Sequence, residues 1–126
     1  MGAVRVLLAD DHANVRAQLR ARLARESFLK IVGEAGNASQ AVEAISQYEP
    51  DILLIDPIMR DGLGVAALKQ IAQRFPQVAI VVLTAAADTS LYMVLRQAGV
   101  RHVLNKCIDS PLLIETLDKL QNEIHN

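Results

Sequence analysis

The stretch DILLIDPIMRD, residues 51–61, decides the fold that the rest of this chain has to form. Residues 52–55 are an unbroken apolar run between Pro50 and Pro57, which is typical of a strand covered on both faces. Proline disfavours helical geometry for the residue before it, so Asp56 should stay extended and project from the carboxyl end of this strand. An isolated Asp-Pro pair more often belongs to a plain loop, so the role of Asp56 depends on the residues around it.

The length of 126 residues corresponds to one domain. A composition of 52% hydrophobic and 21% charged residues, with no low-complexity tract, is typical of a chain that folds. No apolar run approaches the roughly 18 residues of a membrane span, and the N-terminus matches neither a signal peptide nor a myristoylation pattern. We therefore expect a cytoplasmic protein with no membrane partner.

Charge and cysteine content exclude two kinds of site. The net charge of −1 argues against a domain that grips a nucleic-acid backbone by itself, because that needs a net basic surface. The single Cys107 cannot form an intramolecular disulfide, and the Cys and His spacings of a zinc site are absent.

Apolar periodicity along the chain predicts five strands alternating with five helices. The predicted strands cover residues 4–9, 30–35, 52–55, 78–83 and 100–105. The first three predicted helices cover residues 13–25, a segment capped by Asn37 or Ser39 that ends near 48, and a segment that follows a loop with Gly62 and Gly64 and ends near 74. The last two cover residues 91–98, with Gly99 as C-cap, and a segment after Ser110-Pro111. This alternation indicates an α/β fold with one doubly wound parallel sheet.

The apolar content of each predicted strand indicates whether it lies inside the sheet or at an edge. The strands at residues 4–9, 52–55 and 78–83 are almost wholly apolar and read as interior, whereas those at 30–35 and 100–105 carry charged residues and read as edges. With right-handed crossovers, this division into interior and edge strands predicts the strand order 2-1-3-4-5, a flavodoxin-like (βα)5 arrangement. Ligands of such sheets bind outside the carboxyl ends of the strands, where the chain reverses direction.

Five polar residues follow the predicted strands at that edge: Asp10, Asp11, Asp56, Thr84 and Lys106. Carboxylates about 4 Å apart repel by roughly 4 kcal/mol per pair at an effective dielectric near 20, so the group needs a cation. All-oxygen ligands indicate a hard ion such as Mg²⁺. An acid, a metal, a hydroxyl and a lysine together describe a site that transfers a phosphoryl group to a carboxylate.

Over essentially its whole length the chain resembles the receiver domain of a two-component response regulator. The residues that carry the resemblance are Asp10-Asp11, Asp56, Met59, Gly64, Thr84-Ala85 and Lys106. The opening VRVLLADDH at 4–12 and the VGEA at 32–35 are most similar to receivers that precede a LuxR-type helix-turn-helix domain. We therefore expect residues 1–126 to form one receiver domain, with the DNA-binding output domain absent from this chain.

The resemblance implies a role for each residue of the site. Asp56 is the phosphoacceptor, Asp11 ligates Mg²⁺ directly, Asp10 assists through water, and Asp56 and the backbone carbonyl of Ile58 complete the protein ligands. Thr84 and Lys106 bind the phosphoryl oxygens and act as switch residues. The domain would catalyse its own phosphorylation and dephosphorylation without turning over a separate substrate.

The resemblance also implies partners. A sensor histidine kinase or phosphotransfer protein would supply the phosphoryl group, and phosphorylation would change conformation or produce a homodimer that controls transcription. DNA would be bound only through the missing output domain. The predicted fourth helix is apolar nearly all round, and its interface candidates are Leu91, Tyr92, Met93 and Leu95. A tightly buried helix explains the same pattern equally well.

Several residues depart from the family pattern. Val103 stands where the family carries an aromatic switch residue, and the neighbouring His102 should point to the opposite face of its strand. Arg60 and Cys107 replace prolines that many receivers carry, so we expect a trans peptide bond before Cys107. His12 is expected at the start of the first helix, with a ligand or proton-shuttle role as the alternative.

Three other functions share features with this sequence. An aspartyl hydrolase on a similar fold normally has a second acid two residues after the nucleophile, where this chain has Ile58. A flavodoxin-like cofactor binder needs a hydroxyl- or glycine-rich phosphate loop and aromatic residues, but the aromatic content is 3%. The main alternative is a degenerate receiver that binds partners without phosphorylation, which the departures at Val103 and Arg60 motivate.

Overall fold

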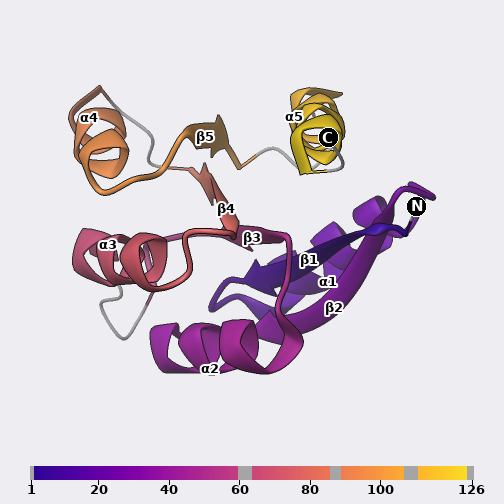
Figure 1. Ribbon diagram of the computed structural model, residues 1–126, viewed down its shortest axis with the longest axis horizontal. Helices are drawn as coiled ribbons and strands as arrows, with labels where there is room; N and C mark the ends of the chain where they lie inside the picture. The colour runs from indigo at the N-terminus through magenta and orange to yellow at the C-terminus, as the bar shows by residue number, and fades with distance from the viewer. Residues whose placement is uncertain (1, 60–63, 86–88, 107–110, 125–126) are drawn as a thin grey trace.

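A computed structural model of the chain describes residues 2–59, 64–85, 89–106 and 111–124. Strands and helices alternate along these residues as predicted (Figure 1). The strands are β1 (Val4–Ala9), β2 (Leu29–Ala35), β3 (Ile52–Ile55), β4 (Ala79–Thr84) and β5 (His102–Asn105). The helices are α1 (Ala13–Leu23), α2 (Ala38–Tyr48), α3 (Gly64–Arg74), α4 (Thr89–Gln97) and α5 (Pro111–Ile124). None of these helices combines the length and the apolar composition that crossing a bilayer requires.

The strands form one parallel sheet in the order β2-β1-β3-β4-β5, which confirms the predicted topology. The chain steps from β1 to the edge strand β2 and then returns past β1 to β3, so its direction reverses between β1 and β3. The site of ligand binding in such a sheet lies beyond the carboxyl ends of the strands near this reversal.

Helices cover both faces of the sheet, and the alternation of side chains along each strand divides the core in two. In β1, Leu7 and Ala9 pack with α2 and α3, whereas Val6 and Leu8 pack with α1 and α5. Figure 1 shows α5 on the side of the sheet opposite to α2 and α3. Because β1, β3 and β4 are buried on both faces, they are the interior strands that their apolar composition predicted.

Helix ends follow the capping residues of the sequence. Asn37, one of the two predicted caps, accepts a hydrogen bond of 2.9 Å from the backbone N–H of Gln40 at the start of α2. Gly99 has a φ of +103° after α4, a conformation that residues with a Cβ rarely adopt. Ser110, the predicted cap of α5, lies outside the described residues.

Three strands differ from the prediction by one or two residues at their boundaries: β2 begins one residue early, at Leu29, and β4 and β5 also shift. Strand β5 begins at His102 rather than at Val100, because the Val100 N–H donates to the carbonyl of Leu95 in α4 at 3.0 Å instead of joining the sheet. Strand β4 extends to Thr84, which is therefore the last residue of the strand rather than the first after it.

Candidate functional site

The carboxyl ends of three strands bring Asp10, Asp56 and Lys106 together. Each residue directly follows its strand, and its backbone N–H still donates to a carbonyl of the neighbouring strand: Asp10 to β2 at 3.0 Å, Asp56 to β1 at 3.1 Å and Lys106 to β4 at 3.2 Å. The sheet ladder therefore holds the backbone of each residue, and only the side chains have freedom at the site.

Lys106 is the centre of this cluster. Its Nζ lies 2.6 Å from Oδ2 of Asp10 and 2.7 Å from Oδ2 of Asp56. The side chains of Lys106, Asp10 and Asp56 are only 11%, 4% and 8% exposed. One ammonium group thus bridges two buried carboxylates, which offsets their mutual repulsion.

This bridge changes the pKa values of Asp10 and Lys106. Burial alone would raise the pKa of Asp10, but hydrogen bonds from Lys106 and His12 outweigh it, so the pKa lies below its usual value. Burial alone would lower the pKa of Lys106, but its bonds to Asp10 and Asp56 raise the pKa above its usual value. Both shifts favour the charged forms of Asp10 and Lys106.

His12 lies at the start of α1 as predicted, and its ring reaches the acid cluster. Its Nδ1 lies 2.9 Å from Oδ1 of Asp11 and 3.0 Å from Oδ1 of Asp10, and its side chain is 55% exposed. The histidine makes no side-chain cap bond to the helix. The alternative from the sequence, a ligand or proton-shuttle role for His12, stays a prediction, and the signal for its contact with both acids was the direct Asp-Asp-His adjacency.

The donor atoms at this edge fit a divalent cation. Asp10, Asp11 and His12 offer ligand atoms that all lie within 4.8 Å of one another. Carboxylate oxygens are the ligands that Mg²⁺ prefers, and Mg²⁺ typically takes one or two of them while retaining water molecules. The backbone N–H of Ile58 donates to Oδ1 of Asp56 at 3.0 Å, so the loop after β3 folds back on this acid. The Ile58 carbonyl as a ligand stays a prediction.

Thr84 lies at the same edge, at the end of β4. Its side chain is fully buried, its Cα pairs with that of Asn105, and its carbonyl accepts the hydrogen bond from the Lys106 N–H. All five residues selected from the sequence therefore follow or end strands at one edge of the sheet. Lys106, which follows β5, joins Asp10 after β1 to Asp56 after β3.

Comparison with known proteins agrees with this geometry. The sequence profile of the response regulator receiver domain matches residues 6–118. The chain belongs to the response regulator receiver domain family. This confirms the family that the site residues predicted.

The chain is similar to bacterial proteins of two lengths, one consisting of about one receiver domain and others about twice as long. It is similar to the chemotaxis protein CheY of Bacillus subtilis, with 32% identity over 120 residues, 95% of this chain and 99% of CheY. It is also similar to the uncharacterized transcriptional regulatory protein YhcZ of the same organism, with 33% identity over 113 residues, 90% of this chain and 53% of YhcZ. The chain thus spans about half the length of the transcriptional regulators it matches.

Among solved structures, the non-phosphorylated receiver domain of the stress response regulator RcsB from Escherichia coli superposes with a TM-score of 0.88. That match has 23% identity and covers 97% of this chain and 95% of the RcsB chain, so it shows the shared fold. The transcriptional regulatory protein YhcZ and the oxygen regulatory protein NreC of Staphylococcus aureus, each 33% identical to this chain, are consistent with the predicted similarity to LuxR-type receivers.

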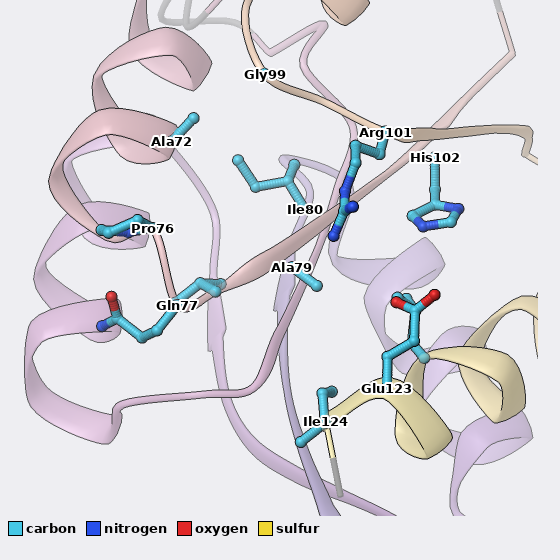
Figure 2. Close-up of a pocket in the computed structure, with 12 residues that line it drawn as sticks. Ala72, Pro76, Gln77, Ala79, Ile80, Gly99, Arg101, His102, Glu123 and Ile124 are labelled. Carbon is cyan, nitrogen blue, oxygen red and sulfur yellow. The ribbon is translucent and has the colours of Figure 1, made fainter. Parts of the chain in front are cut away.

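Val103 and His102 on β5 face opposite sides of the sheet. Val103, which stands where the family carries an aromatic switch residue, is half-buried and packs against the core that includes Leu95 of α4. His102 instead lines a cavity of about 320 Å³ with Leu120 and Glu123 of α5. Figure 2 shows Arg101, His102 and Glu123 around this cavity. Because it opens where β4 and β5 begin, it lies at the end of the sheet opposite to the acid cluster.

The predicted interface residues of α4 differ in their exposure to solvent. Leu95 is fully buried and Leu91 is half-buried against the core, because the apolar stripe of the helix packs on the sheet. Leu95 therefore contributes nothing to the exposed surface of α4, and its part in an interface is not supported by its burial. Tyr92, Met93 and Val94 are 44%, 58% and 43% exposed, so the apolar surface of α4 consists of these three residues. Arg60 and Cys107 lie outside the described residues.

Proposed function

We propose that this receiver accepts a phosphoryl group on Asp56 in a Mg²⁺-dependent reaction and passes the resulting change to a transcriptional output. The observation that carries the proposal is the single ammonium group of Lys106 on the carboxylates of both Asp10 and Asp56. A cation held between a candidate nucleophile and a candidate metal ligand is positioned to follow the charge when phosphate arrives.

The reaction needs a donor with a labile bond to phosphorus. A carboxylate oxygen of Asp56 attacks the phosphorus of a phosphohistidine on a sensor kinase or phosphotransfer protein. A new P–O bond forms, the P–N bond breaks, and its electron pair returns to the histidine of the donor. The product is an acyl phosphate on Asp56, and its later hydrolysis resets the receiver.

The residues at the site divide this work. Asp11, Asp10, Asp56 and the Ile58 carbonyl would hold Mg²⁺, with Asp10 acting through water. When bound, Mg²⁺ neutralises negative charge on the phosphoryl oxygens. Lys106 exchanges its bond to Asp56 for a bond to a phosphoryl oxygen, and the hydroxyl of Thr84 donates to another. No separate substrate is turned over.

Hydrogen bonds to the phosphoryl group determine how far phosphorylation can shift the conformational equilibrium. Phosphorylation adds about −1.5 to −2 charges at Asp56. Charge-assisted hydrogen bonds are worth about 1.5 to 3 kcal/mol each, so two wholly new bonds would supply roughly 3 to 6 kcal/mol. Because Lys106 gives up its bond to Asp56, the net gain from Thr84 and Lys106 lies below this sum. Moving a population from 1:99 to 99:1 needs about 5.5 kcal/mol. Movement of Thr84 is transmitted to α4, whose exposed Tyr92 and Met93 form the output surface, in a homodimer or with a partner domain.

The output is proposed to be DNA binding by a separate helix-turn-helix domain, because YhcZ, which is about twice as long as the matched region, is a transcriptional regulatory protein. The receiver itself would bind no DNA, since its net charge is −1.

The test is the intact mass of the protein after incubation with Mg²⁺ and acetyl phosphate or phosphoramidate, beside an Asp56→Asn variant. A single phosphoryl adduct that needs Mg²⁺ and is absent from the variant supports the proposal. No adduct with any donor or metal would overturn it in favour of a degenerate receiver that binds partners without modification.

A further inference from the structure

The backbone between the two acids of β1 is held by an arginine that no part of the proposed reaction uses. Arg16 of α1 donates from Nη1 to the carbonyl oxygen of Asp10 at 2.5 Å. The same guanidinium donates from Nε to Oε1 of Glu34 on β2 at 3.3 Å. Arg16 therefore joins the end of β1 to the neighbouring edge strand.

The carbonyl that Arg16 binds belongs to the peptide linking Asp10 to Asp11. A peptide unit is planar, so fixing the direction of this carbonyl also fixes the plane that leads into Asp11. The other side of Asp10 is already held, because its N–H donates to the carbonyl of Ala35 at 3.0 Å. With both ends bound, the backbone from which the side chains of Asp10 and Asp11 extend is restrained.

Glu34 in turn orients the arginine. Its Oε1 accepts from Arg16, and its Oε2 accepts from Arg20, one turn further along α1. The side chains of Arg16 and Glu34 are only 21% and 27% exposed, so this chain of contacts is partly shielded from water. Lysine could not replace Arg16 fully, because the guanidinium offers several donors in a fixed plane and an ammonium acts as a point charge.

We infer that Arg16 is a positioning residue for the divalent-cation site, acting through the Asp10 carbonyl and held by Glu34. This inference rests on the proposed function, because it assigns Arg16 a role toward the same Mg²⁺. Residues that orient metal ligands typically change metal affinity about 10- to 100-fold when they are replaced.

The experiment measures Mg²⁺ binding to the unphosphorylated protein by calorimetric titration, for the wild type and for Arg16→Gln, Arg16→Lys and Glu34→Gln. We expect Arg16→Gln to raise the Kd for Mg²⁺ about 10-fold or more. Arg16→Lys and Glu34→Gln should raise it less, because each keeps part of the contact chain. In phosphorylation assays, Arg16→Gln should need more Mg²⁺ for half-maximal rate while reaching nearly the wild-type rate at saturation.

Arg22→Gln is the matched control. Arg22 lies on the same helix, its side chain is 20% exposed, and it pairs with Glu26 four residues later instead of with the acid site. Urea unfolding of each variant separates a loss of folding from a loss of metal affinity. The inference is overturned if Arg16→Gln and Arg22→Gln bind Mg²⁺ equally well, or if Mg²⁺ affinity falls only in proportion to stability. Failure of the proposed function would differ, because the wild type itself would then give no phosphoryl adduct.

Discussion

Lys106 reaches Asp10 across the sheet: Nζ and Oδ2 lie 2.6 Å apart, although β3 and β4 separate the strands that carry them. The same ammonium contacts Asp56, which follows β3. One side chain thus links the two sides of the point where the chain reverses direction. Any event that draws Lys106 toward a new anion at Asp56 must change its bond to Asp10.

Replacing Lys106 with methionine should destabilise the protein and do so less in Mg²⁺. The substitution keeps most of the apolar stem but leaves two buried carboxylates without their shared cation, at a cost of about 3–5 kcal/mol. A bound divalent ion supplies positive charge to the same carboxylates, so saturating Mg²⁺ should recover part of the loss. Urea unfolding with and without Mg²⁺ measures both effects. Lys119→Met, on an exposed position of α5, is the control and should change little; an equal loss in both variants would contradict the prediction.

Asp11→Asn should abolish the stabilisation that Mg²⁺ gives the folded protein. A ligand that binds only the folded state stabilises it by about 2.7 kcal/mol at 100 times its Kd. The amide removes one negative charge and one anionic ligand, so the melting temperature of the variant should no longer rise with Mg²⁺. Asp118→Asn, on the exposed side of α5, should keep the full rise. A normal Mg²⁺ response of Asp11→Asn would remove Asp11 from the metal site.

The sheet order and the positions of the acids were predictable because they follow from strong local patterns. The fully apolar run at residues 52–55 had to be an interior strand, and Pro57 fixed the geometry of Asp56. In a parallel sheet, residues that follow strands meet at one edge whatever the connecting helices do. Asp10, Asp56 and Lys106 therefore converge without any information on side-chain packing.

Contacts that depend on helix rotation were not predictable in this way. The arginines of α1 look alike in the sequence, yet Arg16 turns back to bind the Asp10 carbonyl. Leu95 and Met93 are both apolar residues of α4, but the exact rotation of the helix buries one fully and leaves the other 58% exposed. Periodicity identifies an apolar stripe but not its edges when the helix is apolar nearly all round.

His102 should make the protein less stable below neutral pH. Burial, with the positive charge of Arg101 and despite the opposing effect of Glu123, lowers its pKa below the usual 6.5. The unfolded chain therefore binds the proton more readily, so the free energy of unfolding falls as pH drops from 6.5 through the lower pKa of the folded state. Unfolding titrations of wild type and His102→Gln between neutral and mildly acidic pH should diverge, the variant losing less stability. Parallel curves would exclude this role.

Gly99→Ala should be more destabilising than Gly64→Ala. Both glycines have positive φ, +103° and +53°, so alanine is strained at each, by roughly 1–2 kcal/mol. A Cβ at position 99 would also lie 2.9 Å from the Cβ of Ala72, whereas one at position 64 meets nothing within 4 Å. Overpacking costs typically 1–3 kcal/mol, so this amount should separate the two variants in urea unfolding. Equal losses would mean that α3 moves freely away from position 99.

Met93→Glu should block association of the activated receiver, if α4 provides the output surface proposed above. Met93 is 58% exposed beside Tyr92 and Val94, so a charge there would be buried in any interface that covers this patch. Sedimentation of the beryllofluoride-treated variant should show a dimer Kd at least about 10-fold weaker than that of the wild type. In a separate incubation with acetyl phosphate, the variant should still form the phosphoryl adduct on Asp56. The matched control is Leu112→Glu on α5, where the native side chain is 51% exposed. If Leu112→Glu prevents association and Met93→Glu does not, the interface lies on α5, and the apolar surface of α4 serves another contact.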